Sequence, residues 1–172
     1  RDYLMNGIGA INASSSSTDF DGVRLFEVDV RTFSAGFDAS SRGFDGSWYT
    51  RHYLTYGPNG LGNDIDFVKY NGEGNWLRIL DNRWTLTLRG RVQLSNKQLL
   101  PSSEQFQVGG MYTVRGYPEG LLIGDRGYFF NVEASIPWPG EVSTSSPFAG
   151  RARALLFFDQ GAAFPFKGDN ED

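Results

Sequence analysis

Apolar and polar residues alternate along much of the chain with the two-residue period that is typical of β-strands. Residues 83–94 show it most clearly, because the even positions are apolar or Gly and the odd positions are Thr, Arg or Gln. A soluble strand has roughly five or six residues, whereas a tilted strand that crosses a membrane needs roughly nine to eleven. The length of this segment therefore favours a membrane barrel over a soluble sandwich.

Five further segments are predicted to be strands, although the faces of the second are mixed. They are residues 25–31, 48–56, 69–76, 128–136 and 151–161. Charged residues such as Glu133 and Asp159 stand in the middle of their polar faces. Such a face meets water in a soluble β-sandwich but lines the lumen of a membrane barrel, whose apolar face meets lipid. Aromatic residues near the predicted strand ends, including Trp48 and Trp76, are typical of interfacial girdles and favour the barrel.

The composition agrees with an all-β fold and excludes several functions. Of the 172 residues, 40% are hydrophobic and 15% are aromatic, which is too apolar for a disordered segment. The 22 glycines, with Ser, Asn and Asp between the apolar stretches, suit many strands joined by turns. A net charge of −4 without a basic stripe argues against nucleic-acid binding, and the absence of Cys excludes disulfides and thiolate metal sites. No apolar run approaches the roughly 20 residues of a membrane helix.

Enzyme chemistry finds little support in the sequence. His52 is the single histidine, and we expect it to be a girdle or lumen residue rather than a base. No Gly-x-Ser-x-Gly elbow is present, and nothing favours Glu119 and Asp125 as paired catalytic carboxylates. We therefore predict no catalytic residue, no metal site and no cofactor.

The connection at about residues 96–127 is much longer than the few residues of an ordinary loop. Its distinctive residues are Gly109, Gly110, Tyr112, Arg115, Gly116, Tyr117 and Gly120. A connection of this length is usually either functional or disordered, and this composition predicts an ordered, functional loop.

Three short motifs stand in and after this loop. They are Val114-Arg115-Gly116-Tyr117, Gly124-Asp125-Arg126-Gly127-Tyr128 and Phe157-Phe158-Asp159-Gln160-Gly161. In order and spacing they resemble the two-partner secretion transporters, the exporters of haemolysin and filamentous haemagglutinin. The superfamily of these exporters, which includes the barrel-assembly insertase, carries the first motif at the tip of its sixth surface loop and the last on a following strand. The resemblance covers most of the chain from about Arg24 onward, more loosely before Trp76.

The resemblance implies that the loop folds back into the barrel, where Arg115 and Asp159 clamp it. Strand parity independently aims Asp159 into the lumen, on the face of Arg151 and Arg153. A half-buried carboxylate needs a partner, and a guanidinium can offer two parallel hydrogen bonds. In the competing interpretation, Arg115 is an exposed loop residue, and Arg151 or Arg153 satisfies Asp159.

The remaining motif residues receive supporting roles from the same resemblance. Gly116 would let the loop tip turn sharply, and Tyr117 would give the tip a face to pack. The other residues implied are Val114 in the loop motif, Phe157 and Gly161 in the strand motif, and Gly124, Asp125 and Gly127 as supports.

We therefore predict an all-β fold, a partial antiparallel transmembrane β-barrel with about six strands of about sixteen. Residues 1–172 would form one partial domain of middle-to-late strands, because six strands leave open edges that lipid does not tolerate. The resemblance implies a pore in the bacterial outer membrane that exports a large secreted exoprotein, an adhesin or haemolysin. Its other partner would be outer-membrane lipid. The alternatives are an insertase of the same superfamily and a soluble β-sandwich binding module. The insertase is disfavoured because the sequence of residues 104–115 resembles that of the haemolysin exporters.

Overall fold

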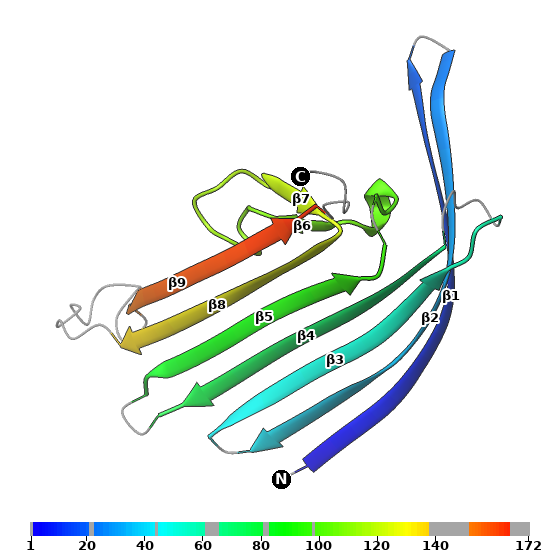
Figure 1. Cartoon of the computed structure of the whole chain (residues 1–172). Coiled ribbons are helices and arrows are strands. Elements are labelled where there is room, and N and C mark those ends of the chain that lie inside the picture. The colour runs from blue at the N-terminus through cyan, green and yellow to red at the C-terminus, as the bar shows by residue number, and fades with distance from the viewer. Residues whose placement is uncertain are drawn as a thin grey trace, which may run out of the picture.

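A computed structural model describes the backbone of residues 2–20, 23–43, 45–60, 66–80, 83–97, 99–137 and 152–165, and the side chains of these ranges from Val30 onward. Seven antiparallel strands form one sheet in the order β1-β2-β3-β4-β5-β8-β9, and β6 and β7 form a separate pair (Figure 1). The strands are β1 (Asp2–Phe20), β2 (Val23–Gly43), β3 (Gly46–Gly57), β4 (Phe67–Ile79), β5 (Thr85–Ser95), β6 (Phe106–Val108), β7 (Leu122–Gly124), β8 (Arg126–Pro137) and β9 (Arg153–Phe164). A short 3-10 turn, η1 (Ser102–Glu104), precedes β6.

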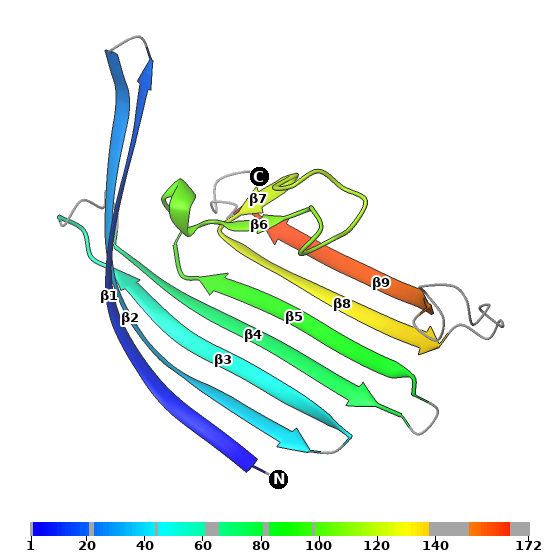
Figure 2. The same ribbon diagram turned by 180° about the vertical axis from the view of Figure 1, so that it is seen from behind.

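The main sheet is a single curved layer, and both views show the β6–β7 pair beside one end of it (Figures 1 and 2). The predicted antiparallel all-β fold is confirmed, and the described residues do not form the two packed sheets of a β-sandwich. Within these residues there is no helix long and apolar enough to cross a membrane.

The sheet contains one strand that the sequence did not predict. β1 is rich in Gly, Ala and Ser, so its faces differ too little in polarity for alternation to reveal it. The predicted strand at residues 25–31 was also too short, because β2 continues to Gly43. Apolar residues of β2 stand at even positions up to Val30 and at odd positions from Phe33, and this change of phase hid the continuation.

The two faces of the sheet differ in chemistry, as the alternation predicted. Odd positions of β4, β5 and β8 place Asn71, Gln93 and Asn131 on the polar face, where all three are buried. Even positions on the opposite face are largely exposed and apolar, as Leu88 and Phe130 illustrate. The strands β4, β5, β8 and β9 extend one to three residues beyond most predicted bounds, although β5 begins at Thr85 and β9 at Arg153, each two residues later than predicted.

The core of the molecule lies between the long loop and the polar face. Phe106 and Val108 of β6 are buried there, together with Leu100 at the start of the loop. The β6–β7 pair contacts β8 and β9, and it lies within the long connection that follows β5. The loop is therefore ordered against the wall of the sheet.

Candidate functional site

The stem of the long loop is bonded to the strands beneath it. The carboxylate of Asp125 is 3% exposed and accepts hydrogen bonds from the backbone N–H groups of Leu99 (3.1 Å) and Leu100 (2.9 Å). On β5, the Nε2 of Gln93 donates to the carbonyl oxygens of Glu104 (2.9 Å) and Asp125 (3.2 Å). These bonds join both ends of the loop at one place, since residues 99–104 open it and Asp125 closes it.

A second anchor of the stem is an ion pair with β4. The Nζ of Lys69 lies 2.5 Å from a carboxylate oxygen of Glu104 and donates to its carbonyl oxygen at 3.2 Å. Both side chains are largely removed from solvent, because Lys69 lines the polar face under the loop. Removing one partner of a buried pair strongly destabilises the folded protein, since the other charge is left buried and unpaired.

Three glycines of the motifs allow the β6–β7 pair to approach the wall. A Cβ at Gly127 would lie 2.4 Å from the ring of Phe106, and one at Gly161 would lie 2.8 Å from Val108. A Cβ at Gly124 would lie 2.7 Å from the backbone of Phe164. Glycine is therefore required at these positions for close packing rather than for a turn.

The tip of the loop places Arg115 against Asp159 of β9. The Nε of Arg115 donates to Oδ2 of Asp159 at 2.6 Å, and a terminal guanidinium nitrogen donates to Oδ1 at 2.8 Å. The backbone N–H of Arg115 donates to the same carboxylate at 3.1 Å. The Asp159 side chain is only 4% exposed, whereas that of Arg115 is 24% exposed. The pair thus has the two-pronged geometry that binds a carboxylate most strongly.

Neighbouring side chains complete the surroundings of the guanidinium. Glu133 of β8 accepts a bond from its other terminal nitrogen at 2.8 Å, and the ring of Phe157 lies 3.8 Å from its central carbon. The pKa of Arg115 is raised above its ordinary value, mainly by the hydrogen bonds to Asp159, although burial acts to lower it. The tip is therefore held by a permanent cation between two carboxylates and an aromatic face.

Polar side chains also bind the backbone of the tip. Asn131 donates through Nδ2 to the carbonyl of Thr113 (2.6 Å) and to Oδ1 of Asp159 (2.8 Å). Arg89 of β5 donates to the carbonyl of Tyr112 (2.7 Å) and to Asn131. Three adjacent strands, β5, β8 and β9, therefore contribute to one network around the tip.

The turn at the tip depends on glycine. Gly116 has a φ of 90° with open space around it, and the N–H of Gly110 donates to the carbonyl of Tyr117 at 3.0 Å. The side chain of Tyr117 is 58% exposed, so its ring does not gain the packed surface that was expected. Val114 is half-buried beside Arg115.

The structure brings some of the expected residues together and separates others. Arg115, Asp159 and Phe157 meet, whereas Arg153 instead binds Ser135 (2.6 Å) and the carbonyl of Arg83 (2.9 Å). Arg151, the other alternative partner of Asp159, lies outside the described residues.

Two residues of the site were not identified as such from the sequence. Glu133 and Asn131 stand on the polar face of a strand that the sequence did predict, and that position was the available signal. Their pairing across β8 and β9, with Asn131 opposite Asp159, depends on a register that alternation does not determine.

His52 lies outside this site. Of its two expected positions, girdle or lumen, it does not take the lumen one. It stands on the apolar face of β3, where Nδ1 is 2.6 Å from the Tyr70 hydroxyl and Nε2 is 2.8 Å from Oγ1 of Thr50. Two hydrogen bonds thus satisfy the imidazole within the sheet.

A curved antiparallel sheet with one exposed, apolar face and one polar face that binds a long loop is the wall of a transmembrane β-barrel. The family described as haemolysin secretion/activation protein ShlB/FhaC/HecB matches residues 8–169, and the chain belongs to this family of two-partner secretion transporters of the bacterial outer membrane. The family resemblance seen in the sequence is thereby confirmed.

Among solved structures, CdiB from Escherichia coli matches with a TM-score of 0.68 and 19% sequence identity. The match covers 98% of this chain and 35% of the CdiB chain. At this identity the likeness shows a shared fold, and the chain spans about a third of the length of that structure. No curated protein matches the chain.

Proposed function

We propose that the chain forms part of a pore that exports a large secreted exoprotein, an adhesin or haemolysin, across the outer membrane. The loop tip is held in the lumen by Arg115 and Asp159 during this function. The observation that carries the proposal is the two-pronged contact between these residues, 44 positions apart in the sequence and joined at 2.6 and 2.8 Å.

The chemistry required of such a site is non-covalent. An unfolded substrate passes along a polar wall, so the wall must offer hydrogen-bonding groups that do not bind the substrate tightly. Residues such as Thr87 and Arg91 of β5, which lie on the polar face beside the loop, supply this surface. The tip occupies part of the same face, and its position therefore decides how much of the wall a substrate meets.

A charge at the tip is better suited to this task than apolar packing alone. The Arg115 contact has a defined geometry, because guanidinium and carboxylate are both planar and their two bonds fix one orientation. Lysine at this position would keep the charge but lose the fork that reaches Asp159 and Glu133 together.

The test is Arg115→Ala in the intact transporter, with secreted exoprotein measured in the culture medium. We expect secretion to be lost while the barrel still inserts, as monitored by heat-modifiable mobility of outer-membrane extracts. Lys97→Gln is the matched control, because Lys97 is an exposed cation at the start of the loop whose backbone is bonded to Ser95 of β5. Normal secretion by Arg115→Ala would contradict the clamp.

The family match supports export rather than barrel assembly as the activity. If the chain acted as an insertase, deleting the transporter would lower the outer-membrane levels of unrelated barrel proteins. We expect those levels to be unchanged and only the exoprotein to be missing from the medium.

A further inference from the structure

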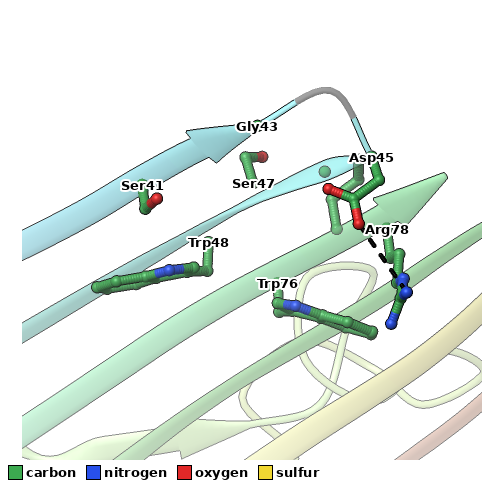
Figure 3. A pocket seen from close by; sticks show the side chains of 9 residues that line it. Ser41, Gly43, Asp45, Ser47, Trp48, Trp76 and Arg78 are labelled. Carbon is green, nitrogen blue, oxygen red and sulfur yellow. Dashed lines mark ion pairs between the residues drawn. The ribbon is translucent and has the colours of Figure 1, made fainter. Parts of the chain in front are cut away.

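A polar cavity opens on the apolar face at the end of the sheet opposite to the long loop. It has a volume of about 290 Å³ and lies where the turn after β2 meets the end of β4 (Figure 3). Asp45 of the turn and Arg78 of β4 face each other across it, with 3.9 Å between a carboxylate oxygen and a guanidinium nitrogen. The N–H of Ile79 donates to the carbonyl of Asp45 at 2.7 Å, which holds the turn against β4.

The charged pair of this cavity is only loosely engaged. More than half of each side chain is exposed, and the separation is near the limit of an ion pair. Exposed pairs of this kind contribute little to stability. Both groups therefore keep hydrogen-bonding capacity for a ligand that carries a negative and a positive charge close together.

An apolar cavity of about 520 Å³ continues from the polar one along the same face. Trp48 and Trp76, which are directly opposite each other on β3 and β4, line both cavities. Figure 3 shows their rings side by side, next to the charged pair. Beyond them the floor is formed by Gly74 and Gly90, which are also cross-strand partners, and a wall by Leu88.

The order of these groups along the strands matches the order of groups in a phospholipid. From Arg78 to Gly74 the strand covers roughly 13 Å, at about 3.3 Å per residue. Over this distance the surface changes from charged, through Trp, to apolar. Tryptophan is typical of the boundary between headgroups and acyl chains, so the charged pair lies at headgroup depth.

We propose that this face binds one phospholipid of the inner leaflet whose headgroup carries a phosphate and a primary amine. Arg78 binds the phosphate, and Asp45 binds the ammonium group. Trp48 and Trp76 contact the glycerol region, and one acyl chain lies over Gly74 and Gly90. The inner leaflet follows from position, because the cavity lies beside the turns after β2 and β4, whereas the long loop, which the family resemblance assigns to the cell surface, is at the other end of the strands (Figure 1).

The choice of headgroup follows from charge complementarity. An anionic headgroup without an amine would satisfy Arg78 but would meet Asp45 with like charge. A trimethylated amine would lack the N–H groups that a carboxylate accepts. A headgroup with both charges satisfies both side chains.

The test is native mass spectrometry of the intact transporter, delipidated in detergent and titrated with phosphatidylethanolamine, phosphatidylglycerol or phosphatidylcholine. We expect one tightly retained phosphatidylethanolamine and weaker binding of the other two. Arg78→Gln should weaken this binding at least about tenfold, because it removes a charge-assisted contact. Asp45→Asn should abolish the preference for phosphatidylethanolamine over phosphatidylglycerol.

Two further variants separate the acyl groove from the headgroup site. In Gly74→Val the new Cβ meets no atom closer than 3.8 Å, so the side chain fills the groove without a backbone clash. This variant should weaken the binding of all three lipids and keep the order of their affinities. Lys97→Gln, which removes a cation at the opposite end of β5, should bind as the wild type does. Equal affinity for the three lipids, a preference for phosphatidylglycerol or phosphatidylcholine, or an unchanged titration in Arg78→Gln would overturn the proposal.

Discussion

Asp159→Asn is the substitution that tests the clamp most directly. It keeps the size of the side chain and removes only the charge that faces Arg115. Arg115 donates to both oxygens of this carboxylate, so the NH₂ group of the asparagine amide faces an Arg115 donor in either orientation, and in one of them it faces Asn131 as well. A donor then faces a donor in a place where the side chain is 4% exposed and water cannot readily replace the lost acceptor.

The loss of free energy in Asp159→Asn depends on the contacts that Arg115 retains. Breaking a fully buried ion pair costs about 3–5 kcal/mol, and a hydrogen bond to a charged group contributes about 1.5–3 kcal/mol. Arg115 is 24% exposed and keeps its 2.8 Å contact with Glu133, so we take the lower part of these ranges. The closed position of the tip should lose about 2–3 kcal/mol, which is about 30- to 150-fold in its opening equilibrium.

Hydrogen–deuterium exchange of the intact transporter measures this quantity. The amides of residues 109–117 include those of Gly110 and Thr113, which are bonded within the tip, and their exchange reports its opening. We expect their exchange to accelerate by that factor, while the amides of β5 and β8 keep their protection. Glu133→Gln is the control, and its effect should be only a few-fold because Glu133 is 35% exposed.

Two results would refute the reasoning. Unchanged exchange of residues 109–117 in Asp159→Asn would show that the ion pair does not hold the tip. Faster exchange throughout β5, β8 and the loop alike would show that Asp159 stabilises the wall of the sheet rather than the loop.

Two other substitutions test the attachment of the loop. Gly127→Ala places a Cβ 2.4 Å from Phe106 and 2.7 Å from the carbonyl of Ala162, and overpacking of this kind typically costs about 1–3 kcal/mol. It should lower the temperature of barrel unfolding, and an unaltered unfolding temperature would show that the contact relaxes freely. Asp125→Ala leaves the N–H groups of Leu99 and Leu100 without their carboxylate acceptor, at about 1–3 kcal/mol. Amide exchange of residues 99–105 should accelerate while the tip stays protected. Unchanged exchange of residues 99–105 would show that Asp125 does not hold the stem.

The strands were predictable where side chains differ strongly between the two faces. The bounds of β8 and β9 lie within three residues of the predicted ones, because bulky apolar residues alternate there with polar ones. β1 was missed since it is rich in Gly, Ala and Ser, and its two faces therefore differ little in polarity. The direction of Asp159 followed from parity alone, because a two-residue period leaves only two faces.

The partners of Asp159 depend on information of another kind. The contact with Arg115 joins residues 44 positions apart, and local pattern carries no signal for it; the motif resemblance supplied the expectation. Glu133 and Asn131 were visible as polar positions, but the register of β8 against β9 decides which of them faces the carboxylate. The exposed ring of Tyr117 was not foreseen, because the path of the turn at Gly116 is a property of the folded loop.

The position of Arg115 between Glu133 and Asp159 makes the charge of the wall depend on the loop. The two carboxylates stand on neighbouring strands, and the cation that neutralises them belongs to a different segment of the chain. If the tip withdrew, it would take its positive charge with it and leave two negative charges on adjacent strands. The same movement that clears space along the wall would thus also make that surface more acidic, so that passing segments rich in Lys or Arg would be attracted to the vacated place.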